Sequence, residues 1–348
     1  MNAPAPSLLQ FPFDAPPAPG EPREIAPGIH WIRMPLPFAL DHINLWLARD
    51  ADGGWTAVDA GYGNDTTRGL WERHFVSTLG GRPIGRIVAT HHHPDHLGNA
   101  AWLAERFGAP VAMTIGEFLT AHATLDQRAA HTVGDTCALF AAHGLDREHV
   151  AAIVARGNAY SRGVPHAPAR IERIVGGDTL RIGAHDWTVI PGWGHSPEHA
   201  ALHAGDGALL ISGDMLLPRI STNVSVWPSD PDGNPLGRFL ASIASFEHLP
   251  ADTLVLPSHG LPFRGIAARV AELRAHHAAR LAELEEALER AGRPMSAGEI
   301  VPVLFRRALD LQQRFFATGE AIAHLNYLWH AKRAHRVTGD GGAIRFSV

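Results

Sequence analysis

Four side chains of metal-binding type fall within six residues of this chain, in the stretch His91-x-His93-x-Asp95-His96. Side chains two apart project to the same side of an extended segment, so His91 and His93 can bind one ion together. Asp95 and His96 follow a change of direction and can face a second ion beside it. Imidazole and carboxylate ligands without a thiolate suit zinc, iron or manganese. The stretch therefore predicts a metal site.

The motif follows a predicted strand, and three later predicted strands also end at a histidine or an aspartate. Residues 85–90 form a short apolar run of strand type, and Pro94 and Gly98 predict that the motif itself is a tight, irregular loop. The later strands are predicted over residues 187–190, 208–212 and 253–256, and they lead to His195, Asp214 and His259. Because α/β proteins place their sites on loops that follow buried strands, these three residues are the further ligands expected.

The order of these motifs resembles the metallo-β-lactamase-fold hydrolase superfamily over roughly residues 25–262, including strand-like stretches at residues 44–47 and 57–61. The resemblance implies a mixed α/β (α+β) fold, an αββα sandwich with two mixed sheets face to face, helices outside and the site at one edge. It implies a first metal at His91, His93 and His195, a second at Asp95, His96 and His259, and Asp214 as the bridge. The implied cofactor is two divalent ions, zinc first, with manganese or iron as alternatives. Asp214 occupies the position where one β-lactamase subclass has a cysteine, which disfavours antibiotic hydrolysis.

Two adjacent ions make hydrolysis the expected chemistry, because coordination lowers the pKa of a bound water from about 15.7 to about 7. Asp95 is the expected catalytic residue, which orients the resulting hydroxide or moves its proton besides acting as a ligand. Asp59 is expected to accept a hydrogen bond from a ligand histidine, with a turn-capping role as the alternative. His199 is assigned to the first turn of a helix rather than to the support of a ligand.

The part of the chain expected to choose the substrate is a helical insertion at residues 115–170. Apolar residues recur at helical spacing over Ile115–Arg128, Thr132–His143 and Arg147–Arg156. These helices are expected to form a lid or pocket wall over the metals, with a homodimer interface as the alternative. The residues expected to contact substrate are Phe38, His42, Tyr160, Arg162 and Trp227.

Residues 264–348 are predicted to be a separate winged-helix-like module. The pattern predicts an exposed amphipathic helix over 273–288 with His276 and His277 on its solvated face, and a capping box at Ser296–Glu299. A third helix over 309–334, interrupted near Gly319, and a hairpin over 336–346 follow. The module has 13 Lys and Arg against 9 Asp and Glu, without a basic stripe, so nucleic-acid binding is not expected. Packing on the catalytic domain or dimerisation is expected instead.

The composition fits an enzyme of ordinary type. The 348 residues carry a net charge of −5, and the single cysteine, Cys137, rules out an internal disulfide framework. Residues 1–22 predict a flexible arm before a catalytic domain at 23–263, and the chain has neither a signal-peptide pattern nor a membrane span. A cytoplasmic location is therefore expected.

The sequence thus predicts a binuclear hydrolase that attacks an ester-like carbonyl, such as a thioester or lactone, in a small metabolite. Two alternative activities stay open: a ribonuclease of the same fold that acts on single-stranded RNA, and a persulfide dioxygenase with a single iron. A third alternative is a DNA-binding regulator without enzymatic activity.

Overall fold

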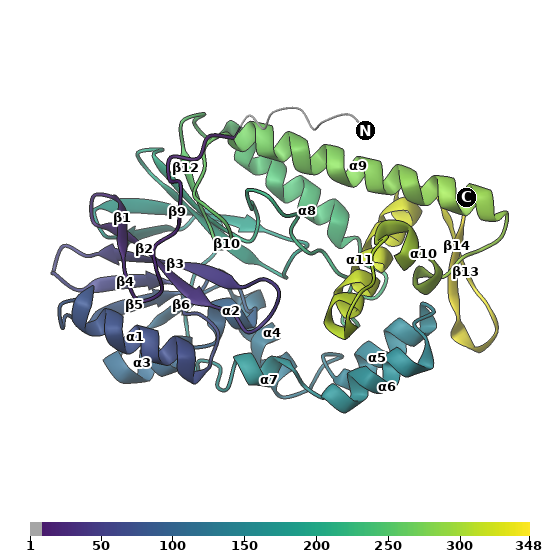
Figure 1. Cartoon of the computed structure of the whole chain (residues 1–348), viewed down its shortest axis with the longest axis horizontal. Coiled ribbons are helices and arrows are strands. Elements are labelled where there is room, and N and C mark those ends of the chain that lie inside the picture. Colours follow the sequence, from purple (N-terminus) through teal and green to yellow (C-terminus); the bar gives the residue numbers. More distant parts are fainter. Residues whose placement is uncertain (1–8) are drawn as a thin grey trace.

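Two large sheets pack face to face in the left half of the view in Figure 1. The computed structural model describes residues 9–348, except for the side chain of Asp340. The first sheet has the order β1-β2-β3-β4-β5-β6-β7. Its strands are β1 Arg23–Ala26, β2 Ile29–Pro35, β3 His42–Arg49, β4 Trp55–Val58, β5 Ile84–Val88, β6 Val111–Met113 and β7 Glu172–Arg173. Pairing is antiparallel from β1 to β4 and parallel from β4 to β7, so the sheet is mixed.

The second sheet has the order β12-β11-β10-β9-β8 and is also mixed, since only β11 and β12 pair in parallel within it. Its strands are β8 Thr179–Ile182, β9 His185–Gly192, β10 His199–Ala204, β11 Leu209–Gly213 and β12 Leu254–Pro257. The predicted strands at 85–90, 187–190, 208–212 and 253–256 correspond to β5, β9, β11 and β12. The expected pair of mixed sheets is therefore confirmed.

Helices cover the outer faces of both sheets, which completes the predicted αββα sandwich (Figure 1). Those of residues 9–263 are α1 Asp65–Ser77, α2 Pro94–Leu97, α3 Ala100–Phe107, α4 Ile115–Leu125, α5 Val133–Ala142, α6 Arg147–Arg156, α7 Tyr160–Gly163, α8 Pro235–Ala244 and the 3-10 turn Ser245–His248. The tail consists of α9 Ile266–Ala291, α10 Ala297–Leu304, α11 Leu311–His330, strands β13 His335–Thr338 and β14 Ile344–Ser347, and the 3-10 turn Asp340–Gly342 between them. Within residues 9–348, no helix has the length and apolar character that a bilayer crossing requires.

The alternation of side chains along the strands explains why the layers form. In β11, Leu209 and Ile211 point into the core between the two sheets, whereas Leu210 packs against the helices outside. In β12, Leu254 and Leu256 likewise face the other sheet and Val255 faces outward. A strand that is apolar on both faces must be covered on both faces, so the short apolar runs of the sequence require a layered fold.

The N-terminal residues are only partly described. Residues 1–8 of the predicted flexible arm lie outside the described part of the chain. The next residues are not a free arm, because Gln10 and Arg264 exchange backbone hydrogen bonds of 3.2 and 2.9 Å, and the ring centroids of Phe11 and Phe263 lie 6.4 Å apart. Phe263 follows β12, so this segment is fixed to the edge of the second sheet.

The tail has the predicted order of helices followed by a hairpin, but two details differ from the prediction. Helix α9 is half-buried, and His277 is only 1 % exposed because it packs against His324 of α11. Helix α11 continues through Gly319 without interruption. The tail also shares one hydrophobic core with the outer face of the second sheet and with α8, so it packs on the two-sheet part of the chain. The assignment of the tail as a winged-helix-like module stays a prediction.

Candidate metal centre

The His91–His96 motif lies where β5 ends, at the edge between the two sheets. Its second half is a single helical turn, α2, rather than the irregular loop expected, because Pro94 has the fixed φ that suits the first position of a helix. This turn changes the direction of the chain between His93 and Asp95. The histidine pair and the Asp95–His96 pair can therefore face two neighbouring points.

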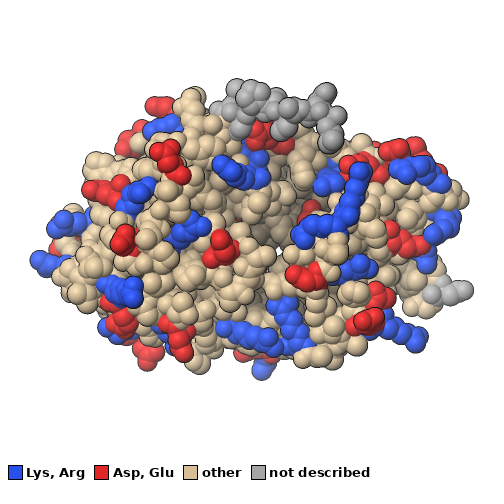
Figure 2. Space-filling model, in the orientation of Figure 1, with Lys and Arg blue, Asp and Glu red and all other residues tan. Residues whose placement is uncertain are grey.

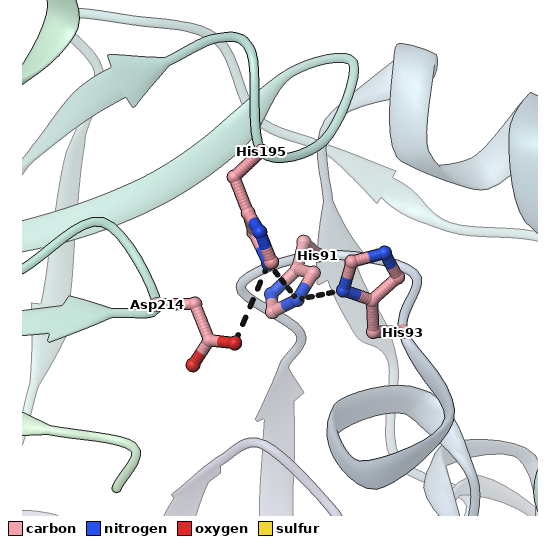
Figure 3. Close-up of side chains that lie close together, drawn as sticks. All are labelled: His91, His93, His195 and Asp214. Atoms are coloured by element: carbon pink, nitrogen blue, oxygen red, sulfur yellow. Dashed lines mark hydrogen bonds and ion pairs between the residues drawn. The ribbon is translucent and has the colours of Figure 1, made fainter. Parts of the chain in front are cut away.

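The four residues His91, His93, His195 and Asp214 place one ligand atom each within 4.8 Å of one another (Figure 3). Nε2 of His91 lies 2.9 Å from Nδ1 of His93 and 3.2 Å from Nε2 of His195. Nε2 of His195 lies 3.4 Å from Oδ2 of Asp214. Such convergence of imidazole nitrogens and a carboxylate oxygen is the arrangement that a divalent ion requires.

A second group of the same kind consists of Asp95, His96 and His259. Oδ2 of Asp95 lies 3.7 Å from Nε2 of His96 and 3.4 Å from Nε2 of His259. Oδ1 of Asp214 lies 3.5 and 3.4 Å from the same two nitrogens. The carboxylate of Asp214 therefore presents one oxygen to each group.

The chemistry of these atoms fits metal ions. Nε2 of His96, Nε2 of His259 and Oδ1 of Asp214 are buried and lack a hydrogen-bond partner among residues 9–348, although they point toward one another. Buried polar atoms are rarely left unpaired. Two ions, one per group, would satisfy all of them.

Electrostatics gives the two groups different protonation states: His91 and His93 of the first are neutral, as ligands must be, whereas His259 of the second carries a proton. Burial, together with neighbouring imidazoles, lowers the pKa of His91 and His93 well below the usual value, so both are neutral at pH 7. Burial opposes ionisation of Asp214, but His259 and His96 hold the pKa of its carboxyl well below the usual range. Burial would lower the pKa of His259, yet Asp214 and Asp95 raise it to about 10. Protons on imidazoles therefore balance the negative charges of the two carboxylates. Bound metal ions would take over this role and release the protons.

Asp59 has the supporting position expected for it. Its Oδ2 accepts a hydrogen bond of 2.8 Å from Nδ1 of His96, which leaves Nε2 of His96 free to face the second group. Its Oδ1 accepts a bond of 2.8 Å from the backbone N–H of Thr90. Asp59 adopts a left-handed φ of 64°, which is unfavourable for a residue with a side chain. These hydrogen bonds hold it there, so the residue is placed by its contacts with the motif rather than by a turn.

The other two supports are backbone carbonyls. Nδ1 of His195 donates to the carbonyl of Asn223 at 2.7 Å, and Nδ1 of His259 donates to the carbonyl of His42 at 2.7 Å. The ring of His42 also accepts a bond of 2.9 Å from the N–H of Gly260. His42 therefore supports the His259 loop, which differs from the substrate contact predicted for it.

His199 was assigned to a helix turn, and this assignment is wrong. His199 is the first residue of β10, is completely buried, and accepts a hydrogen bond of 3.2 Å from the N–H of Asp214 through Nε2. A Cβ on Gly213 would lie 2.3 Å from that nitrogen, so only glycine fits before Asp214. The pairing of β10 between β9 and β11 could have revealed this neighbour, because it brings the start of β10 beside the end of β11.

Sequence reasoning missed Glu117, a completely buried carboxylate at the start of α4. Its Oε2 accepts bonds from the N–H of His92 at 2.9 Å and from the His92 ring at 2.5 Å. Its Oε1 accepts bonds from Ser196 at 2.6 Å and from the N–H of Glu198 at 2.7 Å. Burial would raise the pKa of Glu117, but His92 and the other donors lower it to about 2. The residue joins the two loops that carry His91, His93 and His195.

The remaining predicted substrate contacts lie at different places. Tyr160 donates from its hydroxyl to the carbonyl of His92 at 2.7 Å, so it holds the motif loop. Phe38 packs edge to face on Tyr62 at 5.9 Å, and Trp227 lies 6.1 Å from Phe315 of α11. Arg162 is exposed and donates to the carbonyl of Arg156. Cys137 is buried in α5, and burial raises the pKa of its thiol.

Comparisons with known proteins identify relatives of this chain in sequence and in fold. The sequence profile of the Metallo-beta-lactamase superfamily matches residues 39–259, and that of the Metallo-beta-lactamase-like, C-terminal domain matches residues 281–348. The crystal structure of a Beta-lactamase domain protein from Burkholderia ambifaria is 49% identical and has a TM-score of 0.90, covering 97% of this chain and 98% of that one. A metallo-beta-lactamase family protein from Thermus thermophilus is 30% identical with a TM-score of 0.79, covering 93% of this chain and 99% of that one.

Two curated relatives carry functional names. A probable metallo-hydrolase of Bacillus subtilis is 24% identical over 328 residues, which cover 91% of this chain and 97% of the relative. A hydroxyacylglutathione hydrolase of Cereibacter sphaeroides is 27% identical over 215 residues, which cover 62% of this chain and 61% of the relative. The first similarity extends over both the catalytic region and the tail, and the second over part of each protein.

Proposed function

The chain belongs to the metallo-beta-lactamase superfamily and is a metallo-hydrolase, and from that premise we propose that it is binuclear and cleaves a thioester or a related ester-like carbonyl in a small metabolite. Zinc is the proposed metal, with manganese or iron as alternatives, because this set of histidine and carboxylate ligands accepts all three.

The observation that carries the binuclear proposal is the position of the Asp214 carboxylate. One oxygen lies 3.4 Å from Nε2 of His195, and the other lies 3.5 and 3.4 Å from Nε2 of His96 and His259. A carboxylate that offers one oxygen to each of two ligand groups is suited to bridge two ions. His91 and His93 complete the first group, and Asp95 completes the second.

When bound, a pair of divalent ions supplies a hydroxide nucleophile at neutral pH and polarises the carbonyl that it attacks. The residues of the chain orient and protonate the reactants. Asp95 lies at the edge of the second group, 13 % exposed at its side chain, where its carboxylate can hold the attacking water and take up a proton. The same group can return that proton to the leaving thiolate or alkoxide. Asp59, Asn223 and His42 keep the ligand imidazoles in the tautomer with a free Nε2.

The preference for a thioester draws on the hydroxyacylglutathione hydrolase relative. The charge pattern supports a small substrate rather than a nucleic acid, because Lys and Arg alternate with Asp and Glu on the face that Figure 2 shows. Proteins that follow a phosphate backbone usually carry clustered cations. The helical insertion α4–α7 is proposed as the pocket wall that selects the acyl group.

The first experiment is metal content per chain by plasma mass spectrometry, on protein purified without a histidine tag. We expect close to two zinc or manganese ions. Metal-loaded and metal-free protein are then compared on acyl thioesters, lactones and β-lactams, with thioester turnover expected only for the loaded form. No turnover of any ester-like substrate would refute the proposal. A single iron with oxygen uptake on a glutathione persulfide would favour the dioxygenase, and degradation of labelled RNA would favour the ribonuclease.

A further inference from the structure

An irregular segment, residues 222–233, touches the candidate metal centre at two points. We call it the support segment; it lies between β11 and α8 and forms no strand or helix. Thr222 donates from Oγ1 to the carbonyl of Asp214 at 2.5 Å, and the carbonyl of Asn223 accepts from Nδ1 of His195 at 2.7 Å. The segment therefore fixes the backbone of the bridging carboxylate and the ring of a ligand in the first group.

The tail holds the support segment in place. Helix α11 and strand β13 contact it at several points between Asn223 and Gly233, mostly through polar groups that pair with its backbone. These contacts are Val226 N–H to Gly319 carbonyl at 3.4 Å, Asn223 Nδ2 to Glu320 Oε2 at 3.5 Å, Asn326 Nδ2 to the carbonyls of Pro231 and Gly233 at 3.1 and 3.0 Å, His330 Nε2 to the Asp232 carbonyl at 2.7 Å, and Arg336 to the Asp232 carboxylate.

Helix α11 lies close against the support segment at Gly319, in the middle of the helix. A Cβ at this position would lie 2.8 Å from Oγ and 2.9 Å from Cβ of Ser225, which is closer than real Cβ contacts come. Ser225 in turn donates from Oγ to Oδ1 of Asn223 at 2.8 Å. The glycine that was expected to interrupt α11 instead lets the helix lie directly against the support segment, two residues from the carbonyl that holds His195.

We propose that the tail is a positioning element of the metal centre, which acts through the support segment on His195 and Asp214. This inference rests on the proposed function, because it presupposes that these residues bind metal. Gly319, Asn326 and Ser225 are positioning residues; none of them touches the ligand atoms. The ligand region and the tail are thereby one functional unit.

The support segment depends on the tail for its position because it has no ladder hydrogen bonds to neighbouring strands. An irregular backbone has no such bonds to fix it, and its ordering has an entropic cost that the contacts with α11 must offset. If the segment shifts, the Asn223 carbonyl moves and the ring of His195 loses its orientation. Loss of such outer contacts typically weakens metal binding about 10–100-fold.

The test adds one methyl group at the contact. Gly319→Ala should push the support segment away, while the helix itself gains from the exchange because alanine favours helices over glycine. The compensating variant, Gly319→Ala with Ser225→Gly, removes the group that the new methyl meets. Ser225→Gly alone gives the reference for the double variant. Gly69→Ala is the matched control, because Gly69 lies in α1 and a Cβ there meets nothing within 4 Å.

The readout is zinc affinity, measured by competition with a chromophoric chelator on the metal-free full-length proteins, together with their thermal unfolding. Gly319→Ala should weaken at least one of the two sites about 10-fold without loss of the folded state, and Gly69→Ala should match wild type. The double variant should return to within about threefold of Ser225→Gly, as expected for residues that interact directly.

Unchanged affinity in a folded Gly319→Ala protein would overturn the inference, and so would a double variant no better than Gly319→Ala. If Gly319→Ala does not fold, Asn326→Ala gives the same decision, because it removes two hydrogen bonds to the segment without added volume; wild-type affinity in that variant overturns the inference. A wild-type chain that binds no zinc, manganese or iron refutes the proposed function itself, and the inference falls with it.

Discussion

Two places among residues 9–348 bury histidines side by side, and they differ in what accompanies the imidazoles. The candidate metal centre brings the carboxylates of Asp95 and Asp214 between its rings. The tail pair, His277 and His324, has Nδ1 of one ring 3.2 Å from Nε2 of the other, and His324 also donates to the carbonyl of Glu320.

The pKa values follow this difference. Burial, then the neighbouring ring, lowers the pKa of His277 to about 3, and burial lowers that of His324 to about 4, whereas carboxylates raise that of His259 to about 10. Buried imidazoles alone thus form a neutral packing contact. Imidazoles around an ionised carboxylate form a site in which protons or cations must balance the negative charge.

The largest effect is expected for Asp214→Ala, which removes the carboxylate from the centre. Two cations a few ångströms apart repel, so without this bridge one ion should be lost and hydrolysis should fall about 1000-fold or more. Metal content and turnover of the best thioester measure this. His277→Ala is the control on the other side of the comparison and should keep both ions. Full metal content and activity in the Asp214 variant would refute the ligand assignment.

Glu117→Gln tests whether the metal centre depends on its buried surroundings. Glu117 accepts four hydrogen bonds as a carboxylate, and the amide group of glutamine would face donors. We expect a loss of about 3 kcal/mol in the free energy of unfolding, with zinc binding about 10-fold weaker. Denaturant unfolding and chelator competition measure the two effects. Wild-type values for both would mean that the two ligand loops do not need this bridge.

The tail pair predicts a loss of stability in acid. The unfolded chain binds a proton at His324 below pH 6.5, whereas the folded chain keeps the ring neutral down to a pKa of about 4. The unfolding free energy of wild type should therefore fall as the pH drops from 6.5 to 4, by about 3 kcal/mol from this residue. His324→Leu should show a correspondingly smaller fall, measured by denaturant unfolding at both pH values. Equal pH dependence in the two proteins would contradict the neutral, buried state of the ring.

Glu320 on α11 should change the stability in the opposite direction, so that stability falls as the pH rises. Burial raises the pKa of its carboxyl from 4.5 to about 7, against the opposing effects of Arg280 of α9 and the Asn223 amide. The folded chain keeps this proton in a range where the unfolded chain has lost it, so stability is lost as the pH rises from 4.5 through 7. Because the side chain keeps some exposure, we expect about 1–2 kcal/mol. Glu320→Gln should be more stable than wild type at pH 8 and similar at pH 4, which thermal unfolding would show.

The sequence predicted the parts of this protein that repeat a local pattern. Each apolar run that leads to a candidate histidine or aspartate ligand forms a strand, and that residue follows the strand. The capping box at Ser296 and Glu299 lies at the start of α10, as expected. The three helices of the insertion also lie where the spacing placed them. These features depend on neighbours along the chain, which a single sequence displays.

The features that sequence analysis missed depend on neighbours in space. Glu117 reaches Ser196 across 79 positions of sequence, and His277 meets His324 across 47. Nothing near either residue marks the contact. Gly319 was interpreted from helix propensity alone. The structure shows instead that a glycine is needed there because the side chain of Ser225, on another segment, leaves no room for a Cβ.

The order of the contacts along the chain has a consequence for biosynthesis. All the candidate ligands, His91 to His259, leave the ribosome before α11 begins at Leu311. Chains grow at about 5–20 residues per second, so for several seconds a nascent chain carries every candidate ligand but lacks the helix that steadies the support segment. We expect tight metal loading to follow release of the finished chain rather than to accompany its synthesis.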